Sequence, residues 1–209
     1  MSAKYVKINL DDIIEEFGED RARSILADFS CGLNKDVEDF LRTKAIEFSK
    51  QSIAKTQLIY YIEDAERPKD TLHLVGYFSL TQTIIKVRQK ALSHKLRGRI
   101  SRFARFDYDD KCYILPVILI GQLGKNFKDG NDKYITGKQL LRLAIDSITI
   151  VQRTIAGKFI FLESEDKEKL KEFYSSNGFV AFGNRKLDGD ERNLEGEYLL
   201  QWLYYPPSK

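Results

Sequence analysis

The sequence has few cysteines and histidines, the side chains that most often bind zinc, and few cysteines that could form disulfides. Its 209 residues include two cysteines, Cys31 and Cys112, and two histidines, His73 and His94. They are too few and too scattered for the usual zinc spacings. We therefore expect neither a metal site nor a disulfide. A free cysteine is usually a small buried hydrophobe rather than a nucleophile, and we expect that role for Cys31.

Long apolar runs are also absent. No run approaches the roughly 20 residues that a membrane helix requires. The opening MSAKYVKINLDD lacks the apolar stretch of a secretory signal. We therefore expect a cytoplasmic protein that does not use a membrane. The content of 43% hydrophobic and 12% aromatic residues is typical of a globular protein. Without a repeat or linker, residues 1–209 are expected to form a single domain.

Acidic residues are missing from the segment 84–106, which carries eight lysines and arginines. Since the whole chain has a net charge of +3, the remainder carries −5. An apolar stripe predicts that the segment is a helix broken at Gly98. The stripe consists of Ile84, Val87, Ala91 and Leu92. Its cationic face either binds nucleic-acid phosphates or is simply solvated.

An apolar strand, Ile114–Leu123, is followed by a polar loop, Lys125–Lys133, and then by a helix with Thr136 as its predicted N-cap. Pro116 within the strand requires an edge, a bulge or a first position. A helix N-terminus presents unpaired N–H groups and a positive dipole, so it can hold a phosphate or pyrophosphate. Gly137 permits close approach, and four lysines add positive charge: Lys125, Lys128, Lys133 and Lys138. An ordinary crossover with solvated lysines would produce the same pattern.

Periodicity and turn residues predict the remaining elements. We expect strands at Lys4–Leu10, Gln57–Glu63, Leu72–Leu80, Phe159–Glu163, Phe179–Phe182 and Tyr198–Tyr205, with the second and third forming a hairpin. A helix capped by Asp11 or Asp12 is expected to reach Gly18. Further helices are expected at Arg21–Phe29, after the cap Asn34, and at Lys167–Asn177, where Gly178 ends the helix. The segment Gly183–Gly196 is predicted to be a loop.

Several motifs in this order resemble the GNAT superfamily of N-acetyltransferases. They are Phe29-Ser30-Cys31-Gly32, the stretch from Asp36 to Leu41, Leu74–Leu80, PVILIGQLG, FLESE and FYSSNGF. The set is similar to the branch that includes toxins acetylating the amino acid of charged tRNA. The usual phosphate loop, Gln/Arg-x-x-Gly-x-Gly/Ala, corresponds here to Asp132–Gly137, which keeps only the last glycine.

The resemblance implies an α/β fold of the α+β type. It has a mixed, mostly antiparallel central sheet with a splayed parallel strand pair and helices on both faces. It also implies transfer of an acetyl group from acetyl-coenzyme A to a primary amine by direct attack. Aminoacyl-tRNA, a protein amine and a small amine all remain open as acceptors. The resemblance further implies an antitoxin-like partner and a homodimer. The alternative is a non-catalytic protein of the same fold that binds nucleic acid through residues 84–106.

The resemblance also assigns candidate site residues. Tyr174 would protonate the leaving thiolate, and Glu163 or Glu165 would act as a base. Coenzyme contacts would come from Ile120, Gln122, Leu123, Gly124, Lys125, Lys133, Thr136, Gly137, Lys138 and Asn177. Asn177 could equally serve to end its helix, and Tyr174 could simply pack beside Phe173. The acceptor or a nucleic acid would contact Arg88, Lys95, Arg97, Arg99 and Arg102.

Overall fold

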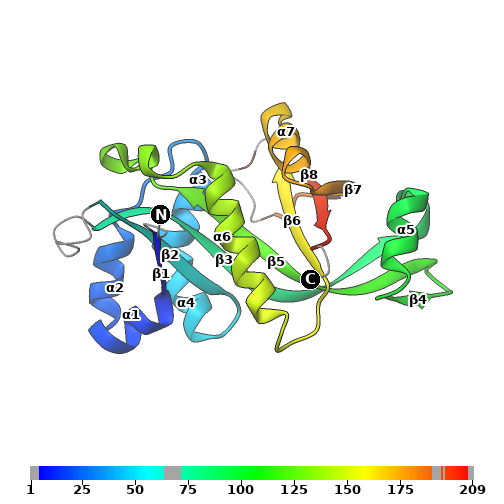
Figure 1. Cartoon of the computed structure of the whole chain (residues 1–209), viewed down its shortest axis with the longest axis horizontal. Helices are drawn as coiled ribbons and strands as arrows, with labels where there is room; N and C mark the ends of the chain where they lie inside the picture. The colour runs from blue at the N-terminus through cyan, green and yellow to red at the C-terminus, as the bar shows by residue number, and fades with distance from the viewer. Residues whose placement is uncertain (1–4, 64–71, 190–193, 195, 207–209) are drawn as a thin grey trace. The chain divides into compact units, whose positions relative to one another are not determined.

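The computed structural model of the chain describes residues 5–63, 72–189, 194 and 196–206 (Figure 1). The chain divides into two compact units. The first comprises Met1–Thr81 and Gly121–Ala144, and the second comprises Gln82–Ile120 and Ile145–Lys209. Three elements contribute residues to both units: β3 (Leu72–Arg88), β5 (Cys112–Lys125) and α6 (Gly137–Val151). The prediction of a single domain stays a prediction.

The first unit holds the N-terminal half of the fold. Its other elements are β1 (Tyr5–Asn9), α1 (Leu10–Phe17), α2 (Glu19–Leu26), α3 (Lys35–Asp39), the π-helical η1 (Phe40–Lys44), α4 (Ala45–Lys50), β2 (Lys55–Ile62) and the 3₁₀-helical η3 (Lys128–Tyr134). Strand β2 pairs antiparallel with β1 and with β3. The predicted hairpin is confirmed, while its turn residues Glu66–Asp70 lie outside the described residues.

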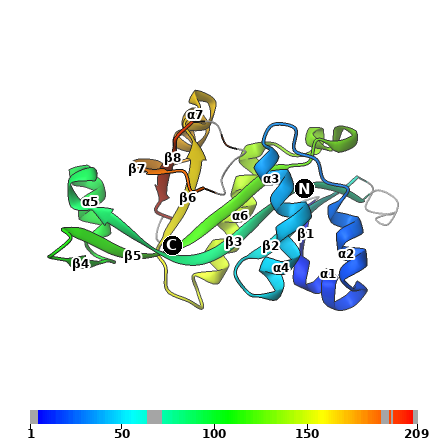
Figure 2. The ribbon, with the colours of Figure 1, turned by 180° about the vertical axis from the view of Figure 1, so that it is seen from behind.

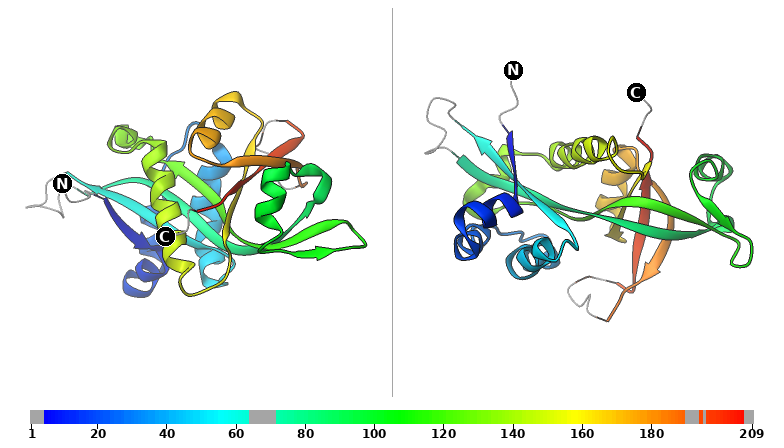
Figure 3. Two further views of the ribbon diagram at one scale, coloured as in Figure 1. Left: turned by 45° about the vertical axis from the view of Figure 1, so that its right-hand side comes forward. Right: turned by 90° about the horizontal axis from the view of Figure 1, so that it is seen from below.

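Helices cover both faces of the strands in the first unit (Figures 2 and 3). Helices α1 to α4 bury their apolar side chains on one face, against Leu58 and Tyr77. Helix α6 lies on the other face, where Gly76 makes room for it. A Cβ atom at Gly76 would lie 2.8 Å from the carbonyl oxygen of Gly124 and 3.2 Å from Leu140. The absence of a side chain there therefore lets two strands and a helix pack closely.

Short polar side chains begin two of these helices. The side chain of Asn34 accepts a hydrogen bond from the N–H of Val37, which confirms Asn34 as the cap of α3. Helix α1 begins differently from the prediction. Its cap is Asn9, whose side chain accepts from the N–H of Asp11 at 3.1 Å, so the expected cap at Asp11 or Asp12 is wrong. Asn9 can act as the N-cap because it lies at the end of β1, where the backbone is extended.

The second unit contains the C-terminal half of the chain. Besides its parts of β3, β5 and α6 it holds the 3₁₀-helical η2 (Gln89–Ala91), α5 (His94–Ile100), β4 (Arg105–Asp107), β6 (Phe159–Glu165), α7 (Glu168–Ser176), β7 (Val180–Lys186) and β8 (Tyr198–Tyr204). Strand β8 pairs antiparallel with β6 and β7, and β4 pairs antiparallel with β5. The aromatic and aliphatic core includes Phe159, Phe161 and Leu203.

Strands β5 and β6 pair in parallel over three residues each, Val117–Leu119 with Phe159–Phe161, although both strands continue. Pro116 lies between this pairing and the antiparallel pairing of β4, which ends at Ile114. Its missing N–H therefore falls at an interruption in the ladder, as expected for proline. The described pairs thus form a mixed, mostly antiparallel sheet with one parallel pair, which confirms the predicted fold class.

The predicted helix over the start of the basic segment is wrong. Residues from Ile84 to Arg88 continue strand β3, and Gly98 lies within α5 rather than breaking a helix. Val87 is buried while Lys86 and Arg88 are exposed, the period of two that a strand requires. The β-branched residues before Arg88 favour that strand. The predicted loop is also shorter, because Gly183–Lys186 belongs to β7.

No helix in the described part of the chain is long and apolar enough to cross a membrane.

Candidate functional site

The N-terminus of α6 is closed by a reciprocal pair of side chains. The hydroxyl oxygen of Thr136 accepts from the N–H of Gln139 at 3.2 Å. The side-chain oxygen of Gln139 accepts in turn from the N–H of Thr136 at 2.8 Å. This is a capping box, and it confirms Thr136 as the N-cap. It leaves the N–H groups of Gly137 and Lys138 without a partner among the described residues. Two donors and the positive helix end therefore remain available to an anion.

The segment before this helix is not a plain loop. Strand β5 extends to Lys125, and η3 follows, with left-handed backbone at Asp129 (φ 52°) and Gly130 (φ 71°). The four lysines expected to add positive charge differ in their surroundings. The ammonium of Lys128 is paired with Asp28 at 2.7 Å. Lys125 and Lys133 lie over aromatic rings, at 5.5 Å from Phe127 and 4.7 Å from Tyr134. Lys138 is exposed.

The end of β5 packs against the loop before α3, within the first unit. A Cβ atom at Gly124 would meet Val37 and Phe29, so this strand and α3 approach closely. The side chain of Gln122 donates to the Asp36 carboxylate at 3.1 Å. Leu123 is half-buried, while Ile120, which belongs to the second unit, is buried. The sequence predicts no contact between Asp36 and Gln122, because they lie 86 positions apart and no spacing links them.

The loop from Ala27 to Cys31 is held by one carboxylate and one guanidinium. Glu38 accepts from the hydroxyl of Ser30 at 2.9 Å and from the N–H of Cys31 at 2.7 Å. Its other oxygen pairs with Arg42 at 2.7 Å, and Arg42 donates to the carbonyl of Phe29. The hydrogen bond from the Cys31 N–H is the main interaction that lowers the pKa of Glu38. Ser30 and Arg42 lower it further. Burial raises the pKa of the Cys31 thiol, which favours the structural role expected for it.

Tyr174 lies in the last turn of α7, and Asn177 follows that helix as its C-cap, both in the second unit. The N–H groups of Phe179 and Gly178 donate to the carbonyls of Tyr174 and Ser175, which forms a Schellman motif with Gly178 at φ 86°. The ring of Tyr174 packs on Phe179, with centroids 5.8 Å apart. The amide of Asn177 donates to the Phe173 carbonyl at 2.7 Å. Asn177 therefore ends the helix, which is one of the two roles expected for it.

Tyr174 is enclosed by aromatic rings. Besides Phe179, its ring contacts Phe173 and Trp202, with centroids 5.1 and 5.7 Å away. Burial raises the pKa of Tyr174 to about 12. The phenol is therefore protonated throughout the neutral range, as a proton donor must be. The hydroxyl has no hydrogen-bond partner among the described residues.

Glu163 is engaged on both carboxylate oxygens. It accepts from the Arg185 guanidinium at 2.9 and 2.7 Å and from the Gln201 amide at 2.9 Å. The three residues lie on the adjacent strands β6, β8 and β7. Glu165, the other expected base, is buried and pairs with Lys167 at 3.2 Å. Because both oxygens of Glu163 already accept hydrogen bonds that join three strands, these contacts favour a structural role for Glu163.

The cations of segment 84–106 lie on several elements of the second unit. Arg88 ends β3, Lys95, Arg97 and Arg99 lie on α5, and Arg102 follows it. Arg97 is half-buried and the other four are exposed. The guanidinium of Arg99 lies 5.6 Å from the centroid of the Tyr205 ring. Lys86 is different, because it pairs with Asp110 at 2.8 Å.

One group of possible metal ligands occurs among the described residues, at the turn between β4 and β5. It consists of Asp107, Asp110 and Cys112. An oxygen of Asp107 already accepts from the N–H groups of Asp109 and Asp110, at 3.1 and 3.2 Å. Asp110 is paired with Lys86. These contacts are those of a turn whose Asp107 side chain accepts from the backbone and whose Asp110 forms an ion pair.

The fold is a mixed sheet in which strand β5 pairs in parallel with β6 and leads through η3 into a helix whose first N–H groups are open. Among solved structures it is similar to the toxin AtaT and to KacT. A tyrosine-to-phenylalanine mutant of AtaT is 17% identical over 98% of this chain and 92% of that chain, with a TM-score of 0.59. A mutant of KacT with the same type of substitution is 16% identical over 96% and 95%, with a TM-score of 0.60.

A complex of AtaT with acetyl-methionyl-tRNAfMet is 20% identical over 96% of this chain and 94% of that chain, with a TM-score of 0.57. At these identities the likeness shows the fold. No family model matches the sequence. No curated protein matches it either.

The environment of Glu38 predicts a pH-dependent contribution to stability. Because folding lowers its pKa, the charged form stabilises the fold above the ordinary value of about 4.3. That contribution is lost as the pH falls through the folded-state pKa. We expect Glu38→Gln to lower the free energy of unfolding by about 1–2 kcal/mol at pH 7, the range for hydrogen bonds to a partly exposed charge. The difference from the unchanged protein should close toward pH 3.

Urea unfolding of both proteins between pH 7 and pH 3 measures this difference. Glu47→Gln is the matched control, because Glu47 is exposed on α4 and its ion pair with Lys50 is long, at 3.5 Å. Its effect should remain within about 0.5 kcal/mol. A loss in Glu38→Gln that is the same at every pH would contradict the assignment.

Proposed function

We propose that the chain is an acetyl-coenzyme A-dependent N-acetyltransferase in which a primary amine attacks the thioester directly. The observation that carries the proposal is the capped N-terminus of α6. The capping box satisfies two of the first N–H groups and leaves those of Gly137 and Lys138 open. The fold supports it, since a solved structure of AtaTR bound with acetyl-coenzyme A shares it with a TM-score of 0.54.

The open N–H groups suit a pyrophosphate for electrostatic and steric reasons. A phosphate oxygen accepts hydrogen bonds from backbone N–H groups, and the helix dipole favours its negative charge. Gly137 has no side chain to obstruct the approach. Lys138 adds an exposed cation beside the same turn. Backbone donors of this kind explain how coenzyme binding persists although Asp132–Gly137 keeps only the last glycine of the usual loop.

Proline at position 137 provides a selective test of these donors. Gly137 is the first residue of α6, a position where proline is well tolerated because its fixed φ suits the helix. Gly137→Pro removes one N–H donor, whereas Gly137→Ala keeps it. We expect Gly137→Pro to weaken acetyl-coenzyme A binding about tenfold or more, as loss of one charge-assisted hydrogen bond would. Gly137→Ala should bind nearly as well as the unchanged protein.

Calorimetric titration measures the affinities, and thermal unfolding confirms them. At a hundredfold excess over Kd, binding adds about 2.7 kcal/mol. For a chain of this size that raises Tm by roughly 5–11 °C. Acetyl-pantetheine lacks the pyrophosphate, so its binding should be insensitive to Gly137→Pro. The absence of any heat or Tm shift with millimolar acetyl-coenzyme A would refute the transferase proposal.

The chemistry requires a bound thioester, a polarised carbonyl and a path for protons. In the proposed arrangement, backbone N–H groups of the segment Ile120–Gly124 bind the pantetheine arm as an added strand would, and one of them polarises the carbonyl. The amine attacks the carbonyl carbon, the carbon–sulfur bond breaks, and the thiolate takes up a proton. The amine loses its proton to water, since Glu163 is engaged by Arg185 and Gln201, and Glu165 pairs with Lys167.

Tyr174 is the proposed donor of the proton to the thiolate. Its pKa of about 12 keeps the phenol protonated, and aromatic packing fixes the ring. Tyr174→Phe keeps that packing and removes only the hydroxyl. We expect kcat to fall by about 10²–10⁴, the usual contribution of general acid catalysis, while KM changes little.

Steady-state release of free thiol measures kcat, and thermal unfolding checks that the variant is folded. Tyr198→Phe is the control, because it removes an exposed phenol from the second unit without involving α7. If kcat were unchanged in Tyr174→Phe, Tyr174 would not be the proton donor, and its role would be limited to the Schellman motif.

The basic segment favours aminoacyl-tRNA as the acceptor class. The segment contains cations but no Asp or Glu. AtaT, which shares the fold, has been solved with acetyl-methionyl-tRNAfMet. Cations that bind phosphates release counterions, so affinity falls steeply with salt. A small-amine acceptor would show no such dependence. We therefore propose that Arg88, Lys95, Arg97, Arg99 and Arg102 contact the phosphates of the acceptor.

Removal of two of these cations tests the assignment. We expect Arg97→Gln with Arg99→Gln to weaken binding of aminoacylated tRNA and to lower the slope of log K against log salt by about one per lost phosphate contact. Lys86→Gln is the matched control, since Lys86 belongs to the same segment but is paired with Asp110. Fluorescence anisotropy over a salt series measures both. An unchanged slope in the double variant would exclude this surface.

The same measurements separate the alternative, a non-catalytic nucleic-acid-binding protein. That protein would bind tRNA with the predicted salt dependence but would bind no acetyl-coenzyme A. A partner protein resembling an antitoxin also fits the fold, since an AtaT mutant has been solved with the C-terminus of the antitoxin AtaR, at a TM-score of 0.55.

A further inference from the structure

The carboxylate of Asp36 lies beside the end of β5 and has no role in the function proposed above. Asp36 is half-buried in the first turn of α3, and one of its oxygens accepts from the side-chain amide of Gln122 at 3.1 Å. Its side chain forms no other hydrogen bond or ion pair with the residues that the structure describes. The second oxygen is therefore open, and the neutral amide leaves the negative charge uncompensated.

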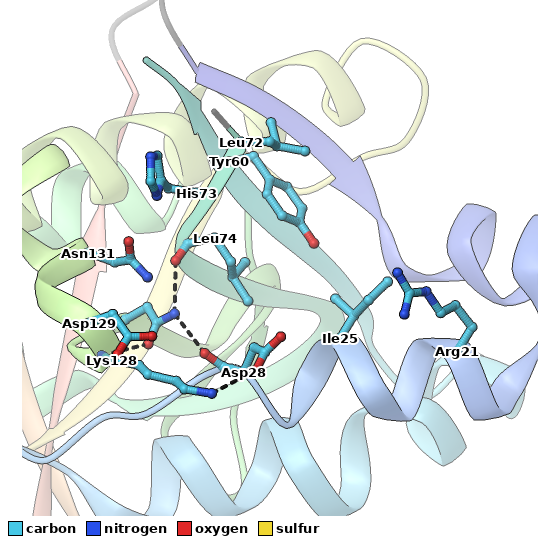
Figure 4. Close-up of a pocket in the computed structure, with 11 residues that line it drawn as sticks. Arg21, Ile25, Asp28, Tyr60, Leu72, His73, Leu74, Lys128, Asp129 and Asn131 are labelled. Carbon is cyan, nitrogen blue, oxygen red and sulfur yellow. Dashed lines mark hydrogen bonds and ion pairs between the residues drawn. The ribbon is translucent and has the colours of Figure 1, made fainter. Parts of the chain in front are cut away.

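Two other carboxylates nearby in the sequence differ from Asp36, because a cation neutralises each of them. Asp28 pairs with Lys128 at 2.7 Å, where both residues line the pocket drawn in Figure 4. Asp39 pairs with Lys35 at 2.9 Å. The helix dipole favours a carboxylate in a first turn, as at Asp36, but it brings no cation to the open oxygen. A positively charged ligand would supply that partner.

Asp36 lies next to a stretch of strand with a free edge. The parallel pairing of β5 with β6 ends at Leu119, although β5 continues to Lys125. The other edge of β5 lies along β3. Gln122 is in the middle of the free stretch, so its hydrogen bond to Asp36 places the carboxylate beside the backbone that would bind the pantetheine arm.

Asp36 and the helix that carries the proposed phosphate donors lie on opposite faces of the strands in the first unit (Figure 3). A Cβ atom at Gly124 would meet Val37 of α3, whereas one at Gly76 would meet Leu140 of α6. The strands therefore separate the negative charge of Asp36 from the site proposed for the pyrophosphate. An acceptor that approaches from the α3 face would not compete with the coenzyme phosphates.

We propose that Asp36 binds the primary amine of the acceptor and directs it at the thioester, an assignment that rests on the proposed transferase function. The open oxygen of Asp36 accepts from one N–H of the amine, while Gln122 holds the other oxygen. The nitrogen lone pair then remains free to attack the carbonyl carbon. As proposed above, the carbon–nitrogen bond forms, the carbon–sulfur bond breaks, Tyr174 protonates the thiolate, and the nitrogen releases its proton to water.

The uncompensated charge of Asp36 also distinguishes between classes of acceptor. It attracts an amine that arrives protonated, whereas an alcohol carries no charge and gains less from it. It repels the α-carboxylate of a free amino acid. An amino acid esterified to tRNA carries an amine but no α-carboxylate, so it avoids that repulsion. Asp36 therefore favours an aminoacyl ester over a free amino acid as the acceptor.

Transfer of radiolabelled acetyl groups from acetyl-coenzyme A to total aminoacylated tRNA tests the assignment in the full chain. Phosphate contacts provide most of the affinity for tRNA, so loss of the Asp36 contact should act on the attack rather than on tRNA binding. We expect Asp36→Asn to lower kcat by about 10- to 100-fold, as loss of a hydrogen bond to a charged group would. The KM for tRNA and the Kd for acetyl-coenzyme A should change less than about twofold.

Two further variants separate the charge of Asp36 from a structural role. Asp36→Glu keeps the charge and should recover part of the kcat that Asp36→Asn loses. Asp12→Asn is the matched control, because Asp12 is an exposed carboxylate in the first turn of another helix, α1. It should leave kcat unchanged. Thermal unfolding shows that each variant is folded. An equal loss of kcat in Asp36→Glu and Asp36→Asn would contradict a role for the charge.

Calorimetric titration with acetyl-coenzyme A separates failure of this assignment from failure of the transferase proposal. If the unchanged protein neither binds acetyl-coenzyme A nor transfers acetyl groups, both are refuted. If it transfers them and Asp36→Asn has the same kcat, only the assignment of Asp36 is refuted. If Asp36→Asn weakens acetyl-coenzyme A binding without lowering kcat, Asp36 contacts the pantetheine arm instead of the amine, and the assignment is again overturned.

Discussion

The arrangement of the first unit depends on the hydrogen bonds of Asn126. This side chain has no contact with water, so each of its polar groups must be satisfied within the protein. Four bonds do so, to Asp28, Ser30, Leu74 and Lys128. They join the end of α2, strand β3 and the segment after β5. Loss of any one partner would leave a buried polar group unpaired, which is why the three segments hold a single arrangement.

Two separate regions gain their geometry from this junction. The segment that starts at Asn126 continues through η3 to the capped N-terminus of α6, where the proposed coenzyme donors lie. The same junction positions Asp28 and Lys128, whose side chains pair at 2.7 Å. A single buried amide thus supports the segment that leads to the proposed phosphate site. The carboxylate of Glu38 fixes the neighbouring loop in a similar way, through Ser30 and Cys31.

Local features were predicted well because their causes are local. A capping box needs only Thr136 and Gln139 three residues apart, and a Schellman motif needs only a glycine such as Gly178 after the helix. Strand β5 and helix α6 followed from apolar periodicity. The segment from Ile84 to Arg88 was misread for the opposite reason. Its apolar residues fit both a helical stripe and a strand, and pairing in the sheet decided between them.

By itself the sequence determined the class of fold, the approximate positions of most strands, the N-cap of α6 and the concentration of cations in residues 84–106. Each of these depends on neighbours within a few positions or on the order of motifs. Only the tertiary structure decided which charges are free. It pairs Glu163 with Arg185, Lys128 with Asp28 and Gln122 with Asp36, across 22, 100 and 86 positions respectively. Such pairs depend on the packing of distant segments, so the spacing of residues in the sequence does not predict them.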